Sequence, residues 1–106
     1  CSLHYGNWEI ALVPARWYGK RCAGIYQPIK NPLVDAFVRR LREPLYPGGL
    51  HGKAHSTGRR MLGWVRDGNA LGILADHRDN RGVTVPFFGQ PAPSTPFPAL
   101  VARSQG

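Results

Sequence analysis

Short apolar runs alternate along this chain with amphipathic stretches, and this alternation limits the fold more than any other feature of the sequence. Apolar runs typical of strands span residues 1–4, 23–27 and 70–75. Apolar residues at helical spacing predict helices over residues 8–18, 31–43 and 56–67. Strands that alternate with helices form layered folds around a parallel sheet. We therefore expect a layered α/β fold.

Proline, glycine and capping residues mark where these elements begin and end. Pro14 predicts a kink in the first helix, and Gly19 predicts its end. Asn31 before a proline predicts the start of the second helix, and Gly68 predicts the end of the third. The remaining expectations are a loop with a short strand over residues 45–51, a strand over 83–88 and a last helix that opens at 94–96 and runs to 103.

The chain has 106 residues and a formal net charge of +8. Its length allows one domain with a buried core. Such a positive charge favours an anionic partner, which the charge alone leaves open between nucleic acid, an acidic membrane surface and a phosphorylated substrate. The basic residues are spread through the chain and form no compact tail.

The ends of the sequence and its cysteines bear on its organisation. The chain begins inside an apolar run without an initiator methionine, so we expect the central part of a longer protein. Cys1 and Cys22 have no metal-ligand spacing, and we expect reduced thiols. His51 and His55 are four residues apart, but no cysteine pair completes a zinc set, so we expect no metal site.

The segment HYGNWE at residues 4–9 places a histidine five positions before a glutamate. In one regular strand or helix the two side chains would point apart, so they can meet only across a bend. Gly6 and Asn7 supply a bend, with His4 at the end of a strand and Glu9 in a first helical turn. A carboxylate beside an imidazole makes a general base for a hydroxyl group. The alternative is a surface histidine near a helix carboxylate.

Two further segments leave a strand at the edge where α/β folds collect their ligands. At residues 24–32 a strand runs into a helix start, where Lys30 could hold an anion; alternatively Asn31 only caps the helix and Lys30 faces water. Residues 76–82 form a polar cluster that is either a solvated loop or a site for a polar substrate. His4 and Asp76 both follow strands, so both are expected at this edge.

Taken together, four blocks resemble the lauroyl/myristoyl acyltransferases of lipid A biosynthesis, which have the glycerophospholipid acyltransferase-like fold. HYGNWE at residues 4–9 resembles the HxGNWE block of that family, and YQPIKNP at 26–32 resembles its YRPxxNP block. LADH at 74–77 resembles the LxDQ block, and VPFFG at 85–89 is followed by Ala92 and Thr95 as in the family. Gln27 and His77 depart from the usual arginine and glutamine.

The resemblance implies a fold and a place in a longer chain. It implies an αβα acyltransferase core of which residues 1–106 are the central catalytic part. Family members continue on both sides, with a membrane-anchoring helix before the histidine block and further sheet and helices after the last block. The isolated piece is therefore expected to be incomplete and inactive. The implied location is the cytoplasmic face of the cell inner membrane.

The resemblance also implies a reaction. An acyl chain moves from acyl-carrier protein to a hydroxyl group of a phosphorylated glycolipid, with no cofactor. His4 would act as the base and Glu9 would hold its imidazole. The candidates for binding the acceptor are Lys30, Arg59, Asp76 and Arg78.

Two other functions compete with this one. The first keeps the dyad and changes the acceptor to a glycerolipid, an ornithine lipid or a mannoside. The second is a non-catalytic basic module that binds nucleic acid, which charge alone suggests. Because the aromatic and basic residues are not interleaved as in RNA-binding proteins, we expect no nucleic-acid partner.

Overall fold

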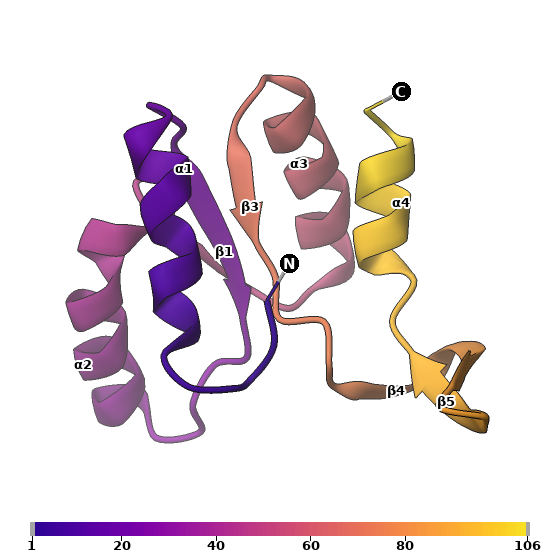
Figure 1. Cartoon of the computed structure of the whole chain (residues 1–106). Helices are drawn as coiled ribbons and strands as arrows, with labels where there is room; N and C mark the ends of the chain where they lie inside the picture. Colours follow the sequence, from indigo (N-terminus) through magenta and orange to yellow (C-terminus); the bar gives the residue numbers. More distant parts are fainter. Residues whose placement is uncertain (1, 106) are drawn as a thin grey trace.

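The structure of the chain, a computed structural model, describes residues 2–105 without the side chain of His55. Its main sheet has three parallel strands in the order β2-β1-β3. The strands are β1 (Cys22–Tyr26), β2 (Leu50–Gly52) and β3 (Ala70–Gly72). The arrows of β1 and β3 point to the lower edge of the molecule in Figure 1, so their carboxyl ends lie there.

Helices surround this sheet. Figure 1 shows α1 along β1, α2 outside α1, α3 beside β3, and α4 beyond α3. A 3-10 helix η1 (Trp8–Leu12) leads into α1 (Val13–Trp17), and a second 3-10 helix η2 (Glu43–Leu45) follows α2. The longer helices are α2 (Pro32–Arg42), α3 (His55–Arg66) and α4 (Phe97–Arg103).

Both faces of the sheet are covered, as successive residues of β1 show. Cys22 belongs to a buried cluster with Leu12 of η1. Ala23 is fully buried beside Gly48, against which Trp64 of α3 packs. Because neighbouring residues of a strand point to opposite faces, helices pack against both sides of β1. The prediction of a layered α/β fold is therefore confirmed.

The first helix differs from its prediction. Residues 8–18 do not form one kinked helix but a 3-10 segment followed by a short α-helix. Pro14 lies in the first turn of that α-helix, where its missing N–H costs nothing. The end at Gly19 is as predicted, since this glycine has a φ of 65°.

The apolar edge strands are shorter than predicted. Cys1, at the start of the first predicted strand, lies outside the described residues, and Ser2 forms a single parallel bridge to Leu74. The predicted strand over 70–75 is continuous only to Gly72. Through this bridge the segment at Ser2 nevertheless runs parallel to the segment that follows β3.

A hairpin follows the main sheet, and its second strand was missed. Strand β4 (Arg78–Phe87) pairs with the antiparallel strand β5 (Gln90–Ser94), and the pairing is irregular between Arg78 and Val83. The hairpin stands apart from the main sheet in Figure 1. Part of the polar cluster at residues 76–82 therefore belongs to a strand that leads away from the sheet edge.

Helix α2 keeps its predicted start and end, but its apolar residues are exposed. Asn31 Oδ1 accepts hydrogen bonds from the backbone N–H groups of Leu33 and Val34, which confirms the predicted cap. Phe37 and Leu41 are both more than half exposed. Over residues 2–105, no helix is long and apolar enough to cross a membrane.

Gly24 in the middle of β1 offers a test of how tightly side chains pack against the main sheet. A Cβ atom on Gly24 would lie 2.6 Å from Cε1 of Tyr46, which is buried and cannot move away. We expect Gly24→Ala to lower the free energy of unfolding by about 1–3 kcal/mol, because overpacking forces neighbours from their rotamers. Urea denaturation measures the change.

Gly63→Ala is the matched control, because a Cβ atom there meets nothing within 4 Å and the residue lies inside α3. This variant should be more stable by about 1 kcal/mol, since alanine favours a helix over glycine. Equal effects of the two alanines would contradict the packing described here.

Candidate active site

His4 and Asp76 meet because of the register of the last parallel pairing. Ser2 bridges Leu74, with the Ser2 N–H donating to the carbonyl of Ile73 at 2.9 Å. His4 and Asp76 each lie two residues further along the two segments. The same register therefore places them opposite each other at the carboxyl ends of the strands, where both were predicted to lie.

The carboxylate of Asp76 holds the histidine at two points. Its Oδ1 lies 2.6 Å from His4 Nδ1, and its Oδ2 accepts a hydrogen bond from the His4 backbone N–H at 2.7 Å. These contacts, the backbone N–H first, lower the pKa of the Asp76 carboxyl below its usual value. An ionised carboxylate only accepts hydrogen bonds, so His4 Nδ1 carries a proton and the lone pair of the neutral ring is on Nε2.

The second ring nitrogen of His4 contacts another histidine. His77 Nε2 lies 3.1 Å from His4 Nε2. The two rings are nearly perpendicular, with centroids 4.1 Å apart and an interplanar angle of 85°. Asp76, His4 and His77 thus form a continuous chain of contacts on a solvent-exposed edge.

Glu9 does not occupy the place predicted for it. The predicted bend is present, because Gly6 has a φ of 62° and Asn7 Oδ1 accepts a hydrogen bond from the Glu9 N–H. The Glu9 carboxylate, however, lies 2.9 Å from Nε of Arg42 in α2. In the part of the chain that the structure describes, no hydrogen bond joins Glu9 to His4. The partner of the imidazole is Asp76, because η1 turns the glutamate towards α2.

A largely apolar cavity of about 340 Å³ begins at His4 and extends between η1, α1 and the main sheet. Its wall includes Trp8, Leu12, Cys22, Leu50 and Ile73. Arg42 also lines it, with its guanidinium 5.1 Å from the centre of the Trp8 ring. Glu9 is linked to this cavity through its ion pair with Arg42.

A second cavity of about 570 Å³ lies on the other side of His4. More of its lining residues are charged or polar than in the first cavity, among them His77, Lys53 and Arg78. Lys53 was not predicted as a site residue, although it directly follows β2 and hence belongs to the carboxyl edge of the sheet. Its position one residue past a short strand was the signal that could have revealed it.

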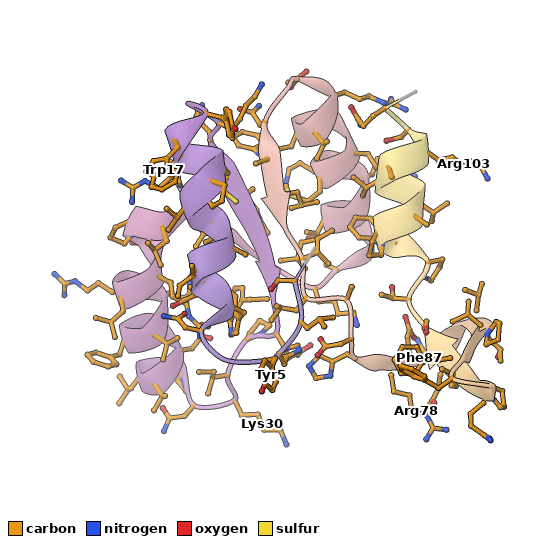
Figure 2. All side chains as sticks on the ribbon, viewed as in Figure 1. Tyr5, Trp17, Lys30, Arg78, Phe87 and Arg103 are labelled. Atoms are coloured by element: carbon orange, nitrogen blue, oxygen red, sulfur yellow. The ribbon has the colours of Figure 1, made fainter. Side chains whose placement is uncertain are left out.

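The structure separates two predicted site residues from these cavities. Lys30 lies at the lower edge in Figure 2, but it lines a different hollow together with Asp35 and Glu43. Asp35 Oδ1 accepts a hydrogen bond from the Ile29 N–H just before α2. Arg59 is exposed on α3 and lines neither cavity beside His4. Of the other two predicted residues, Arg78 lines the second cavity beside His4, and Asp76 contacts His4 directly.

Of the two histidines weighed as metal ligands, His51 has other contacts, and the side chain of His55 lies outside the described part of the structure. His51 Nε2 lies 2.9 Å from the carbonyl oxygen of Gly48, and its Nδ1 lies 2.7 Å from Arg60. Across the residues that the structure describes, no group of three or more histidine, cysteine or acidic side chains could hold a metal ion.

Comparison with known families assigns the chain as a whole. Residues 1–106 match the family model described as bacterial lipid A biosynthesis acyltransferase. A comparison with individual curated proteins gave no match. The family match agrees with the layered α/β fold, confirms the resemblance to this family, and supports an acyltransferase-like function in lipid A biosynthesis. The chain therefore belongs to the bacterial lipid A biosynthesis acyltransferase family.

Proposed function

We propose that this protein transfers a fatty acyl chain from acyl-carrier protein to a hydroxyl group of a phosphorylated lipid A precursor. The observation that carries the proposal is the position of His4 at two cavities, one lined mainly by apolar residues and one with more charged side chains, with Asp76 bound to its Nδ1. An apolar cavity suits a hydrocarbon chain, and a cavity with cationic side chains suits a phosphorylated acceptor.

In this reaction His4 Nε2 accepts the proton of the acceptor hydroxyl as the oxygen attacks the thioester carbonyl. Asp76 holds the imidazole and stabilises the charge that it gains. When the carbon–sulfur bond of the tetrahedral intermediate breaks, His4 returns the proton to the leaving sulfur. The products are an ester and the thiol of the carrier, so the enzyme returns to its starting protonation.

Direct attack by the acceptor agrees with the state of the described cysteine. Cys22 is 1% exposed, and burial raises the pKa of its thiol. A neutral buried thiol is a poor nucleophile. We therefore propose transfer without an acyl-enzyme intermediate.

Arg78 is proposed to bind a phosphate of the acceptor, with Lys53 on the same cavity. Arg78→Ala should raise KM for the phosphorylated acceptor about tenfold, the usual size of one lost charged hydrogen bond. The KM for the dephosphorylated acceptor should stay unchanged. Steady-state kinetics with both acceptors measures the difference.

Arg103→Ala serves as the control, because Arg103 lies at the opposite end of the molecule in Figure 2. It removes the same charge without touching the cavity. An equal rise of KM for both acceptors in Arg78→Ala would exclude the phosphate role.

The identity of the acceptor and the place of the reaction are part of the proposal. A panel of a lipid A precursor, a glycerolipid, an ornithine lipid and a mannoside, all with the same acyl donor, separates the acceptors. We propose that the reaction takes place at the cytoplasmic face of the inner membrane, where the net charge of +8 would favour anionic headgroups.

A further inference from the structure

The contact between His4 and His77 has no role in the mechanism above. Their Nε2 atoms lie 3.1 Å apart, so one hydrogen must lie between the two nitrogens for the contact to be attractive. Since Asp76 fixes the proton of neutral His4 on Nδ1, that hydrogen comes from His77. In the resting site, His77 Nε2–H therefore donates to the nitrogen that acts as the base.

After His4 takes a proton, the direction of this hydrogen bond reverses. The imidazolium of His4 now donates from Nε2, and His77 accepts the bond once its own hydrogen is on Nδ1. Either ring can thus carry the added proton while the other ring accepts the hydrogen bond.

Other charged groups surround the pair. The carboxylate of Asp76 faces His4 from the opposite side. Lys53, Arg78 and Asp79 line the cavity that both histidines border. Replacing His77 leaves these four groups in place. A comparison of the wild type with His77 variants therefore isolates the effect of His77 on the pH dependence of His4.

We infer that His77 is a positioning residue that occupies the base nitrogen of His4 in the resting site and, while no acceptor is bound, accepts a hydrogen bond from this nitrogen when it is protonated. The inference rests on the proposed role of His4. It assigns a purpose to the position where the resemblance predicted glutamine. The acceptor hydroxyl must replace His77 at Nε2 before it can be deprotonated.

His77→Gln tests this role, because glutamine offers a donor and an acceptor but binds no proton at neutral pH. An amide oxygen is a weaker acceptor for the imidazolium than an imidazole nitrogen, so the proton on His4 is held less tightly. We expect the pH at which kcat/KM falls to half its maximum to move down by about 0.5–1 unit, the equivalent of about 1 kcal/mol.

The measurement needs a control and a readout that does not depend on turnover. His51→Gln removes another described imidazole, which contacts Gly48 and Arg60, and should leave the pH profile unchanged. Diethyl pyrocarbonate modifies only the unprotonated imidazole, and peptide mass spectrometry follows its reaction at His4 as a function of pH. The midpoint of this modification should move down in His77→Gln in the same way.

The two readouts separate the inference from the proposed function. A wild-type protein without acyl transfer would contradict the function, while the modification midpoint would still decide the role of His77. An unchanged modification midpoint in His77→Gln would overturn the inference, even if transfer is fully active. A lower midpoint in His77→Gln but not in His51→Gln supports it.

Discussion

Replacing His4 with alanine is expected to lower kcat/KM for acyl transfer by about 10²–10⁴-fold, the usual contribution of a general base. The loss follows from the removal of Nε2, because Asp76 holds the other nitrogen and no second described imidazole has this support. Membranes that contain equal amounts of wild type and variant provide the rates.

The folded state should change little, since the His4 side chain is 40% exposed. An unfolding midpoint close to that of the wild type would show this. Activity within threefold of the wild type in a folded His4→Ala variant would exclude His4 as the base.

Asp76→Asn is expected to cause nearly as large a loss in kcat, about 10²–10⁴-fold, because an amide no longer fixes the proton on Nδ1 and leaves the ring in the wrong tautomer. Glu9→Gln removes only the ion pair with Arg42, whose partners are both partly exposed. We expect a smaller loss of kcat, about tenfold or less, because this change acts on the cavity wall and such partly exposed ion pairs contribute little.

The two amide variants are matched, because each exchanges one carboxylate oxygen for nitrogen without a change of size. The same assay with saturating donor and acceptor compares them directly. A larger loss in Glu9→Gln than in Asp76→Asn would restore the predicted pair of His4 with Glu9 and contradict the pairing in the structure.

Local features of the fold could be predicted from the sequence. The cap at Asn31, the end at Gly19 and the bend at Gly6 depend on a few neighbouring residues, and each is present. The contact of His4 with Asp76 depends on a parallel register between segments 72 residues apart, which a local pattern does not contain. The choice between Glu9 and Asp76 as the partner of His4 therefore needed the structure.

The missed hairpin has a similar explanation. Its turn contains Phe88 with a φ of 48°, followed by Gly89, rather than the asparagine or aspartate common at such turns. Strand β5 contains Pro91 and Pro93, which argue against a strand unless it lies at an edge. With only one partner strand, β5 can accommodate these prolines.

The product formed from acyl-carrier-protein thioester and a phosphorylated lipid A precursor decides whether the protein is an acyltransferase with His4 as its base. Membranes with the wild-type protein or with His4→Ala are compared, and mass spectrometry identifies the product. We expect a precursor heavier by one acyl group with the wild-type protein, and we expect this product to be lost with His4→Ala. The same product at the same rate with His4→Ala, or no product with a folded wild-type protein, would contradict it.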